Sequence, residues 1–204
     1  ALEEARLLAA ETATGLLELG VNTNLAPVAD VVSDAGSFLY KRTYSGDPTV
    51  VADFVATVTD AYAQKGVIVV VKHFPGHGDT AADSHLELPA VAKNLYALEE
   101  LELRPFRALA RKADAVMAGH LFLPELDPVS PASLSRELVT GLLRGKLGFA
   151  GAVITDALEM KAVSADPDSG VKAFLAGADI LLVPDDPRAL LGRLAEACNE
   201  GRIK

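Results

Sequence analysis

Short apolar stretches alternate with longer amphipathic ones along the whole chain. The short stretches are typical of buried strands, and the long ones repeat their apolar residues with the period of a helix. The predicted helices are Leu2 to Leu19, Pro48 to Gln64, Asn94 to Lys112, Ser135 to Leu147, Asp168 to Gly177 and Pro187 to Glu200. The predicted strands are Thr23 to Val28, Val67 to Val71, Asp114 to Ala118, Ala152 to Thr155 and Asp179 to Val183. Pro105 is expected to kink or split the third helix.

Strands joined by crossover helices require a parallel sheet, which is found in two common architectures, the open doubly wound sheet and the closed (β/α)8 barrel. The segments after the predicted strands are long and polar, whereas those after the helices are short. Polar residues at several successive strand ends favour the barrel, and no glycine-rich phosphate-binding loop follows any strand. We therefore predict an α/β fold of (β/α)8 type. About five strand–helix units are visible, so the barrel is expected to be incomplete.

Composition narrows the classes of partner. Half of the 204 residues are apolar and the mean hydropathy is +0.25, as expected of a folded domain. A net charge of −9 without a basic run argues against nucleic acid as a partner. No stretch approaches the roughly 20 apolar residues of a membrane span. The single cysteine, Cys198, excludes an internal disulfide. No cofactor is predicted.

The segment from Lys72 to His85 carries the densest group of titratable residues, directly after a predicted core strand. Within it, Asp83 and His85 are two positions apart, and a carboxylate beside an imidazole fixes its tautomer and raises its basicity. This pair suits general acid/base catalysis, although a turn with a chance histidine is the alternative. Lys72 and His73 can donate hydrogen bonds to sugar hydroxyls, to a carboxylate or to a phosphate.

Asp156 directly follows the predicted strand Ala152 to Thr155, which would place its carboxylate in the mouth of a barrel. It is a candidate nucleophile or base, and a helix cap or loop acid is the alternative. Together with His85 it would supply the two groups of a retaining double displacement at an acetal carbon.

Other residues at strand ends are less specific. Arg42 is a candidate substrate clamp, His120 a candidate binding residue, and Asp30 is expected to cap its loop or to orient Arg42. His77, between two glycines, is expected to be structural. Zinc is a rival explanation for the histidines, but Pro75 and Gly76 argue against the helix that would make positions 73 and 77 suitable ligands.

Taken together, these residues resemble the family 3 glycoside hydrolases, and most closely their bacterial β-N-acetylglucosaminidase branch. The resemblance covers nearly the whole chain and is carried by Asn24-Leu25-Ala26-Pro27-Val28-Ala29-Asp30, Arg42 to Pro48, Lys72 to His85, Gly119-His120 and Ile154-Thr155-Asp156. It implies an enzyme that removes terminal β-linked N-acetylglucosamine from peptidoglycan fragments, without a cofactor or a metal.

The resemblance also implies individual roles. Asp156 would be the nucleophile and His85 the acid/base, with Asp83 as its partner. Arg42, Lys72 and His73 would bind the sugar. Since a neutral imidazole places no second anion beside the intermediate, phosphate could replace water as the acceptor, so hydrolysis and phosphorolysis both stay open. A β-glucosidase of the same family, a non-catalytic sugar-binding fragment and a metal-dependent barrel hydrolase are the alternatives.

The resemblance implies that residues 1–204 are one N-terminal catalytic barrel domain that lacks its first strands and its C-terminal end. An earlier strand of the family, which supplies an aspartate and an arginine to the sugar, has no counterpart here. We therefore expect the isolated segment to be poorly soluble or inactive, because strand edges and apolar faces would be exposed. A cytoplasmic location is expected, with export as the alternative. The oligomeric state is open.

Overall fold

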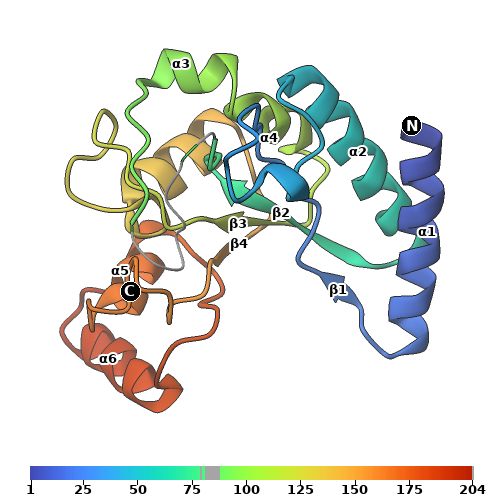
Figure 1. Ribbon diagram of the computed structural model, residues 1–204. Helices are drawn as coiled ribbons and strands as arrows, with labels where there is room; N and C mark the ends of the chain where they lie inside the picture. The colour runs from blue at the N-terminus through green and yellow to red at the C-terminus, as the bar shows by residue number, and fades with distance from the viewer. Residues whose placement is uncertain (79, 81–87, 204) are drawn as a thin grey trace.

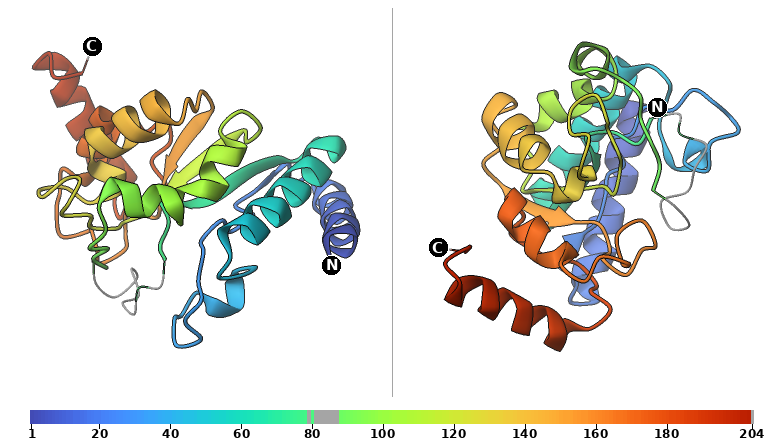
Figure 2. Two further views of the ribbon diagram at one scale, coloured as in Figure 1. Left: turned by 90° about the horizontal axis from the view of Figure 1, so that it is seen from above. Right: turned by 90° about the vertical axis from the view of Figure 1, so that its left-hand side faces the viewer.

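The computed structural model describes residues 1–78, 80 and 88–203. They form an α/β architecture around one parallel four-stranded sheet of order β1-β2-β3-β4 (Figure 1). The strands are β1 (Thr23–Asn24), β2 (Ile68–Phe74), β3 (Ala115–Ala118) and β4 (Ala152–Thr155). The α-helices are α1 (Leu2–Glu18), α2 (Pro48–Lys65), α3 (Leu95–Glu100), α4 (Leu103–Leu109), α5 (Ser169–Ala176) and α6 (Pro187–Asn199). Figure 2 shows α1 and α2 side by side at one end of the molecule and α6 at the other.

Among the described residues there are also three helical elements that are not α-helices. They are the 3₁₀ turns η1 (Tyr40–Arg42) and η2 (Ala132–Leu134) and the π-helix η3 (Glu137–Lys146). Ser135 was expected to cap the helix that η3 forms, and its Oγ atom accepts the amide hydrogen of Leu138 at 3.3 Å. Aspartates 47 and 186 cap α2 and α6 through their side chains, and each is followed by a proline at the first helical position.

Two predicted strands are shorter than expected. Of Thr23 to Val28, only the first two residues pair regularly with β2, and Val28 bridges Lys72 in isolation. Pro27 lies between these pairings and has no amide hydrogen to donate. The predicted strand Asp179 to Val183 contacts β4 through one bridge, Ile180 to Ile154. Here the Asp179 carboxylate accepts the Val153 amide at 2.7 Å, in place of a regular ladder bond.

The predicted helix Asn94 to Lys112 is split, but the break lies before Pro105 rather than at it. Helix α3 ends at Glu100, the following Leu101 has φ and ψ of −125° and −82°, and α4 begins at Leu103. A proline ring clashes with a helical carbonyl four residues earlier, which here belongs to Leu101. Pro105 therefore lies inside the first turn of α4, and the chain bends where the clash would occur.

Alternation along the strands divides the core into two layers. Outward residues of β2, β3 and β4, such as Val71, Val116 and Val153, pack with α2, α4 and η3 in the main cluster. Inward residues form a separate cluster made by Val70, Ala115, Met117 and Ile154, with Ala152 and Leu182 packed against it. The inner face of the sheet is thus apolar along the strands, and the polar site lies where they end. In the described part of the chain, no helix has the length and apolar character needed to cross a membrane.

Candidate active site

Side chains from the ends of β2 and β4 continue the inner face of the sheet. Lys72 follows Val70 by two positions and Asp156 follows Ile154 by two, so alternation directs both inward. Burial lowers the pKa of Lys72, the charge of Arg42 lowers it further, and Asp156 and Asp30 act to raise it. The structure therefore brings both Arg42 and Asp156 within electrostatic reach of Lys72.

The backbone fixes the position of Asp156. Its amide donates to the Ala118 carbonyl at 2.9 Å, which ties the end of β4 to the end of β3. Its Oδ1 atom accepts the amide hydrogen of Ala157 at 2.9 Å. The side chain is half-buried, so one carboxylate oxygen is held by the protein while the group stays accessible from the strand ends.

Asp30 is completely buried and organises the segment after β2. Its Oδ2 atom lies 2.7 Å from Nδ1 of His73, and its Oδ1 atom accepts the His77 amide at 2.7 Å. Burial by itself would raise the pKa of Asp30, but the His73 ring and the His77 amide stabilise the carboxylate, and the pKa falls below its ordinary value. A carboxylate can only accept, so Nδ1 of His73 carries the hydrogen.

His77 is held inside its loop. Its Nδ1 atom lies 2.5 Å from the Thr80 hydroxyl, and its ring makes a T-shaped contact with the Phe38 ring at a centroid distance of 5.1 Å. Its Nε2 atom is buried and has no hydrogen-bond partner among the residues that the structure describes. Burial lowers the pKa of His77, so the neutral ring is the stable form at neutral pH.

His120 supports the segment of Asp156. Its Nε2 atom lies 3.0 Å from the Ala157 carbonyl, which can only accept, so Nε2 carries the hydrogen. Nδ1 then accepts from the Ser133 hydroxyl at 2.6 Å. Burial lowers the pKa of His120, which favours this neutral form. Both ring nitrogens are used within the protein, and direct contact of His120 with a substrate stays a prediction.

The structure thus places Lys72 and His73 near the end of β2 and Asp156 directly after β4, while Arg42, the last residue of η1, lies within electrostatic reach of Lys72. Asp83 and His85 lie outside the described residues, so their roles stay predictions. Asp30 was expected to cap its loop or to orient Arg42. It instead bonds to His73 and to the His77 amide. The signal that could have revealed this was already in the sequence, because Asp30 follows a predicted strand just as Asp156 does.

A second carboxylate that sequence reasoning missed is Glu102, which is fully buried beneath the segment of His77. It lies between Leu101 and Leu103, but other charged residues, Glu99, Glu100 and Arg104, are close by in the sequence, so no local pattern singles it out.

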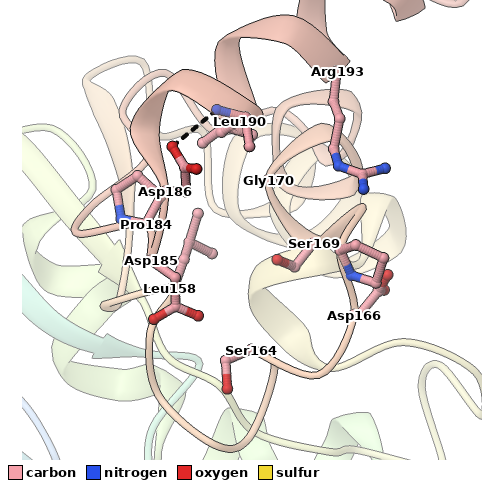
Figure 3. Close-up of a pocket in the computed structure, with 12 residues that line it drawn as sticks. Leu158, Ser164, Asp166, Ser169, Gly170, Pro184, Asp185, Asp186, Leu190 and Arg193 are labelled. Carbon is pink, nitrogen blue, oxygen red and sulfur yellow. Dashed lines mark hydrogen bonds between the residues drawn. The ribbon is translucent and has the colours of Figure 1, made fainter.

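A pocket of about 180 Å³ lies apart from this group, between the loop after β4, α5 and α6 (Figure 3). Two of the three carboxylates that line it bind other groups of the protein, because Asp186 caps α6 and Asp166 pairs with Lys172. It contains none of the predicted site residues. Within the described ranges, no three histidine, cysteine, aspartate or glutamate side chains are grouped so that they could hold a metal ion.

The chain is similar in sequence to proteins of one known family. The family description "Glycosyl hydrolase family 3 N terminal domain" matches residues 1–204. A beta-hexosaminidase of Aromatoleum aromaticum is 36% identical over 191 residues, covering 92% of this chain and 53% of that protein. Beta-hexosaminidase A of Pseudoalteromonas piscicida is 36% identical over 186 residues, covering 83% of this chain and 31% of that protein. The chain thus spans between a third and about half of the length of these relatives.

Among solved structures, the family 3 β-N-acetylglucosaminidase of Paenibacillus sp. str. FPU-7 superposes with a TM-score of 0.96 at 41% identity. The match covers all of this chain and 40% of that one. A β-glucoside phosphorylase superposes with a TM-score of 0.94 at 26% identity, covering all of this chain and 39% of that one. With these neighbours, the parallel sheet and its crossover helices belong to the (β/α)8 barrel class, as the sequence predicts.

Proposed function

Since the chain belongs to the family of glycosyl hydrolase family 3 N-terminal domains, we propose that it supplies the catalytic centre of a retaining exo-glycosidase. The substrate of the proposal is a terminal β-linked N-acetylglucosamine, as the names of the relatives and of the Paenibacillus structure suggest. The proposal that this sugar comes from peptidoglycan fragments is based on the sequence resemblance alone.

One observation carries the proposal most directly, namely that Asp156 follows β4 on the inner face of the sheet, within electrostatic reach of Lys72. A carboxylate at this position is a suitable nucleophile for an electrophilic carbon at the strand ends. Lys72 and Arg42, together with Nε2 of His73, are suited to hold the hydroxyl groups of a pyranose. The Asp30–His73 bond fixes the orientation of the ring through Nδ1 and leaves Nε2 to hydrogen-bond a sugar hydroxyl.

The proposed reaction has two steps. The Asp156 carboxylate bonds to the anomeric carbon as the bond from that carbon to the leaving oxygen breaks, and His85 gives its proton to that oxygen. In the second step His85 takes a proton from water, the water oxygen bonds to the anomeric carbon, and the bond to Asp156 breaks. Two inversions retain the β configuration, and Asp83 would orient the His85 ring.

The test is the Asp156→Asn variant in the complete gene product that carries these residues. Turnover of an aryl β-N-acetylglucosaminide should fall by about 10³-fold or more, because the nucleophile is lost while the shape of the side chain is kept. Mass spectrometry should detect a covalent adduct of a fluorinated N-acetylglucosaminyl substrate on the wild type and none on the variant.

Asp185→Asn is a matched control, since Asp185 is exposed and lines the separate pocket near α6. This variant should keep wild-type turnover and labelling. Equal turnover by wild type and Asp156→Asn would rule out the role of Asp156. If Asp156→Asn kept full activity and a metal chelator abolished that activity, the metal-dependent alternative would be favoured.

A β-glucosidase is the second candidate, supported by the structural likeness to a β-glucoside phosphorylase. The higher identity to the β-N-acetylglucosaminidase, 41% against 26%, favours the N-acetylated sugar. Values of kcat/KM on a matched pair of aryl glucoside and aryl N-acetylglucosaminide separate the two candidates.

A further inference from the structure

Glu102 is a buried carboxylate at the break between α3 and α4. Its Oε1 atom pairs with the ammonium of Lys93, whose side chain is 36% exposed, while that of Glu102 is 0% exposed. Its Oε2 atom is buried without a hydrogen-bond partner in the described part of the chain. The side chain makes no capping bond to α4. A buried carboxylate with one unpaired oxygen costs free energy, so stability alone does not explain a glutamate at this position.

The backbone of the loop after β2 packs directly on this side chain. Gly76 and Gly78 have φ angles of +119° and +60°, which favour glycine. A Cβ atom at position 76 would overlap the Cβ and Cγ atoms of Glu102. A Cβ atom at position 78 would lie 3.1 Å from Oε1 of Glu102. The loop can approach this closely only because both residues lack a side chain.

His73, which precedes the two glycines, and His77, which lies between them, both belong to the candidate active site. His77 donates its amide to Asp30, and His73 bonds to Asp30 through its ring. Asp30 follows β1, whereas Glu102 lies next to α4, so two buried carboxylates from different elements hold one short segment. A shift of the glycines would therefore move His73 relative to Asp156.

We propose that Glu102 is a positioning residue for catalysis: with Lys93 it holds Gly76 and Gly78 in place and thereby fixes Lys72 and His73 at the sugar site. The inference rests on the proposed function. Glu102 itself touches no substrate, and its effect reaches the reaction through the loop backbone. Lys93 acts with it as one unit, because it partners the only paired oxygen of Glu102 among the described residues.

The first test is kinetic. In the complete gene product, Glu102→Gln should lower kcat/KM for an aryl β-N-acetylglucosaminide by about tenfold, since small misplacements of binding groups cost one to two orders of magnitude. The midpoint of urea unfolding should stay at or above that of the wild type, because the variant buries no charge and Lys93 can turn toward solvent. The double variant Lys93→Met with Glu102→Gln should lose no more activity than Glu102→Gln alone.

Glu100→Gln is the control, because Glu100 is exposed on α3 two residues away and should change neither quantity. Glu102→Asp keeps the charge but draws it back from the loop, so it should recover part of the lost activity. Unchanged kcat/KM in Glu102→Gln would overturn the proposal. A loss of activity that only tracks a lower unfolding midpoint would overturn it as well.

The second test does not depend on turnover. Amide hydrogen exchange of His77, whose N–H bonds to Asp30, should become at least about tenfold faster in Glu102→Gln while amides of α1 and α2 keep their rates. Unchanged exchange at His77 would overturn the proposed hold on the loop. If the wild type turns over no glycoside but exchange at His77 responds as expected, the proposed function fails and the hold of Glu102 on the loop stands.

Discussion

At the scale of single residues, buried carboxylates decide where the polar side chains of the site lie. Asp30 contacts two histidines that follow it by 43 and 47 positions, and it is fully buried. A buried charge is tolerated only when it is paired and hydrogen-bonded, and Asp30 meets both conditions. The stability of the loop and the orientation of His73 thus depend on the same group.

Asp30→Asn tests this dependence. The amide can still accept one hydrogen bond but lacks the charge, so we expect the free energy of unfolding to fall by about 1.5–3 kcal/mol. Turnover of the aryl N-acetylglucosaminide should fall by up to about 10²-fold as His73 loses its fixed orientation. Urea unfolding and steady-state kinetics measure the two effects. Asp53→Asn, at an exposed position of α2, should change neither.

Sequence reasoning found the strand-end residues Lys72, His73 and Asp156 because residues at the ends of parallel strands gather in space. It did not find the partner of His73, nor the contact of Glu102 with Gly76 and Gly78. Those contacts join segments far apart in the chain, and their distances depend on how the helices pack. Spacing along the sequence carries no information about such packing.

At the scale of elements, the helices were predicted better than the strands. Periodicity and capping residues such as Asp47 mark helix boundaries locally, and the structure begins α2 at Pro48 as expected. Strand pairing depends on the neighbour, and the Asp179 side chain replaces a ladder bond beside β4 in a way that no local pattern reveals. Likewise, η3 is a π-helix, a rare form that the helical periodicity of the sequence does not distinguish from an α-helix.

Removal of the cap of α2 provides a test at this scale. Oδ1 of Asp47 accepts the Thr49 amide at 2.8 Å. Asp47→Ala should therefore lower the free energy of unfolding by about 1 kcal/mol, measured by urea denaturation followed by circular dichroism. Asp47→Ser keeps a capping oxygen and should recover most of the loss. Identical midpoints for the alanine and serine variants would show that the cap contributes nothing.

At the scale of the whole molecule, buried histidines couple stability to pH. Burial lowers the pKa of both His77 and His120. In the unfolded chain a histidine has a pKa of about 6.5. Below that pH the unfolded state binds more protons than the folded state, so stability rises with pH through this range. The contribution of these two histidines to the free energy of unfolding is fully present above about pH 6.5. It is lost as the pH falls from there through the lowered pKa values of His77 and His120 in the folded protein.

His120→Asn removes one of these titrations while its amide can still donate to the Ala157 carbonyl. We expect the free energy of unfolding of this variant to fall less steeply between about pH 6.5 and pH 5 than that of the wild type. Ser133→Ala keeps the titrating ring and should retain the steeper dependence. Equal slopes for wild type and His120→Asn would contradict the assignment of a lowered pKa to His120.

The order of the strands in the sheet is the same as their order along the chain. In the described sheet, each strand pairs with the strand that precedes it in the sequence, so no later strand has to insert between two earlier ones. Because chains emerge from the ribosome N-terminus first, the sheet can grow by one strand and its covering helix at a time. The sheet can therefore fold during translation. Once β1 and β2 have paired, the free edge of β2 can bind β3 before the residues around Asp156 have been synthesised.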